Sequence, residues 1–312
     1  MNQIPLKARQ IQLKLLPRYQ RMHRFVSAYQ RSHPVVRQIP CVLRLAIISF
    51  SVLLILANVA ALVILFTFDS ESARFISGGD PRQFYRELQV DLLDDYGEVS
   101  GIAHNAGNRV GTTLEALAYG ADIIEIDVVL VQDQLHAAHW SPFRFIGDRF
   151  FRGPTLAEVW GTAAQAEAIK LDLRNASKEM VSELVGFLGN RQSEHIEVIA
   201  VSEKPGVLAL LGQQLPDVTA MLSVSDHGFL HDLLSDEDLL NLIDGVSVNE
   251  ILLDATTVTF LEEKGLIIFA WTVNDPSRMN ELIEYGINGI TTDNLAILDL
   301  LGERERVETT DR

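Results

Sequence analysis

The sequence predicts a parallel (β/α)8 barrel preceded by one transmembrane helix, and two features of the chain lead to this expectation. Residues 45–68 contain no charged side chain, and the segment before them carries nine Lys or Arg and no Asp or Glu. Beyond residue 98, eight short apolar runs alternate with amphipathic stretches, which is the pattern of eight strand–helix repeats. Together these features indicate one membrane-spanning element and one large α/β domain.

The distribution of charge excludes a single soluble globule. The 312 residues include 26 basic and 42 acidic side chains, for a formal net charge of −16. Because residues 1–68 carry +9, residues 69–312 carry −25. Blocks of such opposite charge indicate two environments. The basic block suits anionic membrane lipid as a partner, and nucleic acid is not expected, because the block adjoins an apolar span and has few interleaved aromatics.

Leu45 to Phe68 is the predicted transmembrane helix. At about 1.5 Å per residue it would extend roughly 36 Å, enough to cross a hydrocarbon core of about 30 Å. A buried core helix fits less well, and a cleaved signal peptide would need an unusually long basic region. Basic residues that flank a span stay in the cytoplasm. We therefore expect a single-pass protein of the cell membrane, with a cytoplasmic amino terminus and an extracytoplasmic catalytic domain.

Five segments follow from these boundaries. Residues 1–44 form the basic cytoplasmic segment, 45–68 the transmembrane helix and 69–98 a membrane-proximal linker or helix. Residues 99–302 form the barrel, and 303–312 form a charged tail. The single cysteine, Cys41, precedes the span, so the outer domain has no disulfide bond.

Each repeat of the barrel pairs an apolar, β-branched strand with an amphipathic helix. The predicted strands are Val99–His104, Ile123–Val131, Ala168–Arg174, Ile196–Ser202, Val218–Val224, Gly245–Ile251, Leu266–Val273 and Gly286–Thr291. A short extension, Leu135–Trp140, follows the second strand. The predicted helices are Thr112–Tyr119, Thr155–Gln165, Lys178–Leu188, Pro205–Leu215, Glu237–Leu242, Thr256–Lys264, Pro276–Glu284 and Leu295–Leu301.

Polar side chains collect at the carboxyl ends of the first three predicted strands, where a barrel of this kind carries its active site. Converging carboxylates repel one another unless a cation neutralises them, and an all-oxygen site favours Ca²⁺ or Mg²⁺. Histidines titrate near neutrality and suit acid–base catalysis, and a guanidinium suits phosphate. The residues therefore indicate cleavage of a phosphodiester, and they are His104, Glu125, Asp127, His139, Asp172 and Arg174.

The order of several motifs resembles the glycerophosphodiester phosphodiesterase family, within the wider group of phospholipase-C-like barrel phosphodiesterases. The likeness extends over about residues 100–300 and begins with the sequence Ala-His-Asn-Ala-Gly. The motifs are Ala103–Gly107, Gly111–Ala116, Gly120–Val128, Asp133 with His139, Pro154–Glu158, Ala270–Asn274 and Gly289–Asp293.

The resemblance implies a role for each residue that matches a family motif. His104 and His139 would be the acid–base pair, although the sequence does not assign the two roles. Arg174 stands where the family has a phosphate-binding Lys, and Trp271 would line the wall against the alcohol of the substrate. The implied metal ligands are Glu125, Asp127 and Asp172.

The sequence departs from the family pattern at four positions. Asn105 replaces the Arg after the first histidine and can offer phosphate only a neutral hydrogen bond. Gly111 replaces the Glu of the second motif, Trp140 replaces the Asp after the second histidine, and the third metal acid is the shorter Asp172. Because related barrels that act on lysophospholipids also use Asp as third acid, a lysophospholipid-like substrate is expected beside glycerophosphodiesters.

The stretch between His139 and Pro154 is aromatic and basic, which suits a lipid–water interface beside the active site. The same aromatics could instead pack this loop onto the barrel. The predicted function is a membrane-anchored, metal-dependent phosphodiesterase. The alternatives are a catalytically weakened relative that binds lipid or phosphodiester, and a lyase of the same fold that releases a cyclic phosphate. The sequence indicates no particular protein partner.

Overall fold

The computed structural model of the chain describes residues 48–59, 84–88, 98–139, 151, 153–191 and 195–308, with the side chains of 303–308 excepted. The chain divides into two compact units, Met1–Ile64 and Leu65–Arg312. In the first unit, residues 48–59 form an α-helix. Within the described residues, none of the helices has both the length and the hydropathy that a membrane crossing requires. The rest of the predicted span 45–68, and the predicted segment 1–44, lie outside the described residues.

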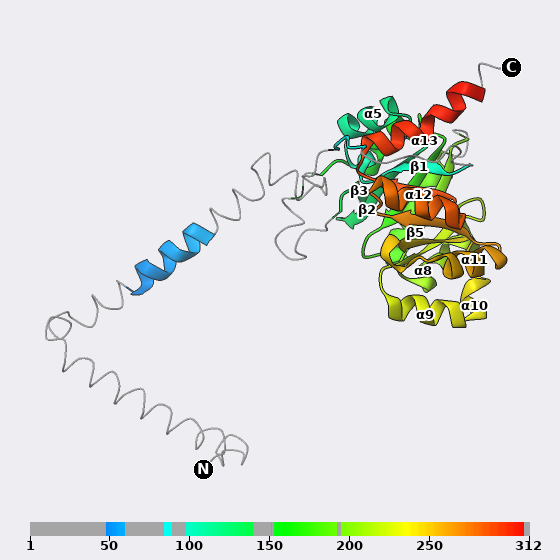
Figure 1. The fold of residues 1–312 in the computed structure, drawn as a ribbon. Helices are drawn as coiled ribbons and strands as arrows, with labels where there is room; N and C mark the ends of the chain where they lie inside the picture. The colour runs from blue at the N-terminus through cyan, green and yellow to red at the C-terminus, as the bar shows by residue number, and fades with distance from the viewer. Residues whose placement is uncertain are drawn as a thin grey trace, which may run out of the picture. The chain divides into compact units, whose positions relative to one another are not determined.

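The second unit contains a barrel of eight parallel strands, which Figure 1 shows surrounded by helices. All eight predicted strands are confirmed, with ends that differ by a few residues. Pairing of the first two strands closes the barrel, and β3 lies antiparallel to β2 where the sequence predicted a short extension. The strands are β1 (Ser100–Ala103), β2 (Ile123–Val131), β3 (Gln134–Ala137), β4 (Ala168–Leu173), β5 (Glu197–Ser202), β6 (Thr219–Val224), β7 (Gly245–Asn249), β8 (Ile267–Trp271) and β9 (Gly289–Thr292).

Helices follow the strands and cover the outside of the barrel. All eight predicted helices are present, and α9 was not predicted. The helix α13 continues beyond residue 302, so part of the predicted charged tail 303–312 is helical. The helices are α5 (Val110–Ala118), α6 (Leu156–Ala163), α7 (Lys178–Gly189), α8 (Pro205–Gln214), α9 (His227–Ser235), α10 (Glu237–Leu240), α11 (Ala255–Glu263), α12 (Pro276–Tyr285) and α13 (Leu295–Glu308), with 3-10 turns η1 (Ala106–Asn108) and η3 (Glu250–Leu252).

Side-chain caps fix where several of these helices begin. Thr155 and Glu158 form a reciprocal capping box before α6, in which each side chain accepts a hydrogen bond from the backbone N–H of the other. Asp226 caps α9 in the same position by accepting a hydrogen bond from the N–H of Phe229. A single capping Asp before a short apolar stretch is a weak sequence signal, and this accounts for the helix that the sequence did not predict.

Strand side chains alternate between the two faces of the barrel, so the described residues form a separate apolar core on each face. The larger core lies between the strands and the helices. The smaller one fills the interior of the barrel with buried side chains that include Ile102, Met221 and Phe269. Gly289 makes room inside, since a Cβ atom there would lie 2.7 Å from the ring of Phe269. The interior is therefore packed below the polar residues of the site.

Residues 84–88, within the predicted linker or helix 69–98, are extended and not helical. Tyr85 forms a parallel bridge with Asn294, directly after β9. The backbone N–H of Leu295 donates to the carbonyl of Tyr85 at 2.8 Å, and the Asn294 side chain donates to the carbonyl of Glu87, also at 2.8 Å. The segment before the barrel is thus tied to the loop that follows its last strand.

Candidate active site

The polar residues of the site lie on inward-facing positions of neighbouring strands. In the pairing of β2 with β4, Glu125 lies beside Lys170 and Asp127 lies beside Asp172. Residues two apart on a strand point to the same face. Two successive layers of charged side chains therefore face the barrel axis, above the apolar interior.

The structure brings the predicted site residues together around one cavity of about 280 Å³. Asn105 lies at its edge, with its amide nitrogen 3.2 Å from Nε2 of His104. The other predicted residues line the cavity directly, and they are His104, Glu125, Asp127, His139, Asp172, Arg174 and Trp271.

Asp127 is the most tightly held carboxylate of the site. The buried side chain of Asn108 donates to its Oδ2 at 2.7 Å and accepts a hydrogen bond from its backbone N–H at 2.9 Å. His139 Nδ1 lies 3.2 Å from Oδ1, and Nε of Arg174 lies 3.8 Å from the same oxygen. Burial favours the neutral acid, but the hydrogen bonds from His139 and Asn108 and the charge of Arg174 outweigh it and lower the pKa of Asp127.

Asp172 and Arg174 form the second charged pair. Nη1 of Arg174 donates to Oδ2 of Asp172 at 2.9 Å, and Nη2 lies 3.3 Å from Nε2 of His139. The guanidinium of Arg174 therefore contacts Asp127 on β2, Asp172 on β4 and the imidazole of His139. Burial, followed by the charge of Asp127, raises the pKa of Asp172 to about 6 against the attraction of Arg174.

His104 directly follows β1, which pairs with β2 on the side away from β4, and it also lines the cavity. Its Nδ1 lies 2.8 Å from Oδ1 of Asp293, directly after β9. Burial opposes the charged form of His104, but the hydrogen bond to Asp293 and the charge of Glu125 outweigh it and raise the pKa to about 9. Below that value the imidazole is an imidazolium held by a carboxylate.

Three side chains that hydrogen-bond to predicted site residues were not themselves predicted from the sequence. Lys170 lines the cavity, Asn108 orients Asp127, and Asp293 partners His104. Lys170 could have been found, because it is the inward-facing position two residues before Asp172 on a predicted strand. Asn108 and Asp293 become neighbours of the site only through the fold.

Phe151 is the one aromatic residue of the predicted aromatic and basic loop that the structure describes. Phe151 is buried, and its ring packs edge-on against the ring of His136 at 4.9 Å. This residue therefore packs the loop onto the barrel. The rest of 140–150 and residue 152 lie outside the described residues.

A divalent cation is the cofactor that the sequence implies. Within the described residues, no three His, Cys, Asp or Glu side chains lie close enough together to hold a metal ion. The donor chemistry nevertheless fits, because carboxylate oxygens of Glu125, Asp127 and Asp172 line one cavity and suit a hard cation.

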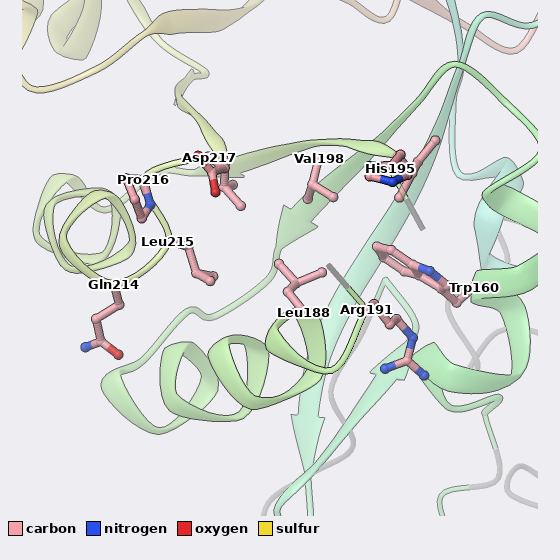
Figure 2. Close-up of a pocket in the computed structure, with 11 residues that line it drawn as sticks. Trp160, Leu188, Arg191, His195, Val198, Gln214, Leu215, Pro216 and Asp217 are labelled. Carbon is pink, nitrogen blue, oxygen red and sulfur yellow. The ribbon is translucent and has the colours of Figure 1, made fainter. Parts of the chain in front are cut away.

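A second cavity, of about 400 Å³, lies elsewhere on the barrel. Figure 2 shows it between the end of α7, the end of α8 and the segments that lead into β5 and β6. Its lining residues, among them Leu188, Val198 and Leu215, lie where those strands begin. It is therefore at the amino-terminal end of the barrel, whereas enzymes of this fold carry their active sites at the carboxyl end.

Comparison with known proteins identifies the barrel. The model of the glycerophosphoryl diester phosphodiesterase family matches residues 157–297. Over these residues the chain is similar to that family. The resemblance stated from the sequence is confirmed, and by family the barrel is an enzyme that hydrolyses phosphoric diesters. The matched residues include Asp172, Arg174 and Trp271, while both histidines of the site precede them.

Solved structures of family members share the fold. A phosphodiesterase from Oleispira antarctica, in complex with the product sn-glycerol-3-phosphate, is 18% identical over 65% of this chain and 96% of its own, with a TM-score of 0.55. A glycerophosphodiester phosphodiesterase from Thermotoga maritima is 18% identical over 66% of this chain and 99% of its own, with a TM-score of 0.51. One from Parabacteroides distasonis is 19% identical over 69% and 98%, with a TM-score of 0.50. No curated protein matches the sequence.

Removing the side chain of Asn108, which hydrogen-bonds to Asp127, should destabilise the barrel. Asn108→Ala leaves the buried Asp127 carboxylate without one of its donors, so we expect the free energy of unfolding to fall by about 2–3 kcal/mol, measured by urea denaturation. Asn190→Ala removes an exposed hydrogen bond to Gly186 and serves as control, with an expected loss below about 1 kcal/mol. Equal losses in the two variants would contradict the role given to Asn108.

Proposed function

We propose that the chain is a metal-dependent glycerophosphodiester phosphodiesterase in which His104 is the general acid and His139 the general base. The observation that carries this assignment is the pair of different hydrogen-bond environments on the two imidazoles. His104 is held by Asp293, and His139 lies between Asp127 and Arg174. Family membership supports the reaction class, and the residues below support the roles.

The surroundings of His104 support a charged imidazole. Its raised pKa keeps it protonated at neutral pH, so that both ring nitrogens carry a proton. Among the described residues, Oδ1 of the Asn105 amide has no hydrogen-bond donor, while Nδ2 faces the ring nitrogen Nε2. Turning the amide by 180° places Oδ1 against Nε2–H and satisfies both groups. Asn105 would then hold the acidic proton toward the cavity.

The contacts of His139 fit the tautomer that a general base needs. A guanidinium can only donate, so Nε2 of His139, which lies 3.3 Å from Arg174, is the unprotonated nitrogen. The proton is then on Nδ1 and is donated to Asp127. This tautomer leaves a lone pair on Nε2 inside the cavity, as a general base requires.

The reaction follows from these two charge states. His139 Nε2 takes a proton from water as the water oxygen attacks phosphorus, and the bond from phosphorus to the alcohol oxygen breaks. His104 gives its Nε2 proton to that oxygen, so the products are a phosphomonoester and a neutral alcohol. When the substrate phosphate binds, Arg174 donates to its oxygens instead of to His139. Attack by a neighbouring substrate hydroxyl would first give a cyclic phosphate, by the same proton transfers.

Glu125, Asp127 and Asp172 would hold the divalent cation, Ca²⁺ or Mg²⁺. A bound cation would supply Lewis-acid stabilisation of the phosphoryl oxygens. Asn108 keeps the carboxylate of Asp127 in one orientation toward that position, and the charge of Arg174 supplements it from the mouth of the cavity.

The shape of the cavity favours a compact, hydroxylated substrate over a lysophospholipid. At about 280 Å³ it is small for a ligand site. Hydroxyl side chains of Ser223, Ser247 and Thr272 line it, as does Glu203. The Trp271 indole is fixed by a 2.9 Å hydrogen bond to the carbonyl of Ser247 and forms a rigid wall. A glycerophosphodiester fits these contacts, and an acyl chain would have to lie outside.

We also propose that the chain is anchored in the cell membrane by residues 45–68, with the amino terminus inside and the barrel outside. The helix 48–59 supports this, because its large apolar side chains are exposed, from Val52 at 50% to Phe50 at 67%. The polar Asn58 donates to the carbonyl of Leu54 at 2.7 Å and so satisfies its amide within the helix.

The catalytic assignment predicts strong and separate losses for the two histidines. With full-length protein, Ca²⁺ or Mg²⁺ and a panel of glycerophosphodiesters and lysophospholipids, phosphorus NMR should detect monoester release that chelator abolishes. His104→Ala and His139→Ala should each lower kcat/KM by about 100- to 10,000-fold. His231→Ala, on the exposed face of α9, is the control. Absence of turnover, or parental rates in both variants, would refute the proposal.

The Asp293 contact predicts the pH dependence of the reaction. His104 must be protonated to act as acid, so kcat/KM should fall as pH rises through its pKa of about 9. Asp293→Asn removes the partner charge and should move this basic limb to lower pH by about one unit or more. Asp299→Asn, which removes a partly exposed carboxylate paired with Arg86, should leave the basic limb of the pH profile in place. If the basic limb of the kcat/KM profile does not move in Asp293→Asn, the assignment of His104 as general acid is contradicted.

The membrane topology can be tested through the single cysteine. In intact cells, a membrane-impermeant maleimide should not label Cys41, and it should label Cys41 once the cells are permeabilised. In a Cys41→Ser/Ser235→Cys variant, whose thiol is on exposed α9, labelling of intact cells is expected. The reverse pattern would overturn the proposed orientation.

A further inference from the structure

Lys170 places an ammonium group inside the barrel, paired with Glu125. The residue is 1% exposed and lies in the middle of β4. Its Nζ donates to Oε1 of Glu125 at 3.1 Å and to Oγ1 of Thr291 at 3.3 Å. Below it lie the apolar side chains of the barrel interior. A charge in such surroundings is stable only beside its partner, so the Lys170–Glu125 pair is a fixed part of the fold.

Both oxygens of Glu125 are already engaged. Oε1 accepts from Lys170, and Oε2 accepts from the backbone N–H of Asn105 at 3.3 Å. These are the oxygens that a metal ion would need. Glu125 is itself 4% exposed, so its carboxylate has little freedom to turn away from Lys170.

The other two carboxylates have partners that can leave. Asp127 and Asp172 contact Arg174, whose side chain is 33% exposed at the mouth of the cavity. A substrate phosphate can draw this guanidinium away and free the carboxylate oxygens for a cation. Lys170 also borders the cavity, but its side chain is buried and its ammonium group is held by Glu125 on β2 and Thr291 on β9. The three carboxylates therefore differ in how available they are.

We infer that Lys170 is a built-in counter-ion that competes with the divalent cation for Glu125. It keeps the barrel folded without metal and weakens metal binding, so that the cation is held mainly by Asp127 and Asp172. This inference rests on the proposed metal-dependent function. Its physical basis is charge: an ammonium group repels a nearby cation and occupies one of its ligand oxygens.

The test is metal binding by the full-length chain. Calorimetric titration of Ca²⁺ into parent and Lys170→Met should give a Kd at least about tenfold lower in the variant, because one repulsive charge is gone and Glu125 is released. In chelator, the variant should melt at a lower temperature than the parent, and Ca²⁺ should raise its melting temperature more. Lys264→Met removes a lysine that pairs with Glu237 on the surface, and is expected to bind Ca²⁺ like the parent.

A double variant covers the case in which Lys170→Met does not fold without metal. Lys170→Met/Glu125→Gln removes both charges, and competition predicts a Kd within about threefold of the parent, because the ligand and its competitor are lost together. A weakening of more than about tenfold would show that Glu125 is a full ligand in the parent and would overturn the inference.

The failures of the two proposals are distinguishable. If the parent binds Ca²⁺ and Lys170→Met binds it with the same Kd, the inference about Lys170 is wrong and the proposed function stands. If neither protein binds Ca²⁺ or Mg²⁺, the metal dependence in the proposed function is wrong as well.

Discussion

The site depends on one constraint, which is that the charges brought side by side by strands β2 and β4 must be compensated. The register of these strands sets Glu125 against Lys170 and Asp127 against Asp172, in two layers above an apolar interior. Buried carboxylates persist only with partners. In the lower layer the partner is a buried lysine, and in the upper layer it is an arginine that reaches in from the mouth. This difference separates a fixed structural charge from a movable one that can turn to substrate.

The two histidines also contact carboxylates, each at a different part of the cavity. His139 contacts Asp127 and the guanidinium of Arg174, whereas His104 contacts Asp293. In the proposed assignment these different neighbours give the two imidazoles opposite protonation states. Asp293 in turn follows β9, where the segment containing Tyr85 is paired with the backbone. The chain before the barrel thus supports the loop that sets the charge of His104.

The sequence was sufficient for much of this account, because the barrel depends on periodicity and the site on strand ends. Alternation along β2 placed Glu125 and Asp127 on one face, and the motif spacing selected His139. It was not sufficient for partners that come from distant segments. Asn108 lies in a short turn without periodicity, and Asp293 is far along the chain from His104. Alternation along β4 places Lys170 on the inward face with Asp172, but its pairing with Glu125 depends on the register between two strands, which no local pattern specifies.

The most direct test of the central claim is the protonation of the two imidazoles. Nitrogen-15 NMR of histidine side chains in the full-length protein, at about pH 7.5, reports both ring nitrogens of each residue, with His104→Ala and His139→Ala assigning the signals. The account predicts an imidazolium at His104 and a neutral ring at His139 with its proton on Nδ1. A neutral His104, or a charged His139, would contradict it.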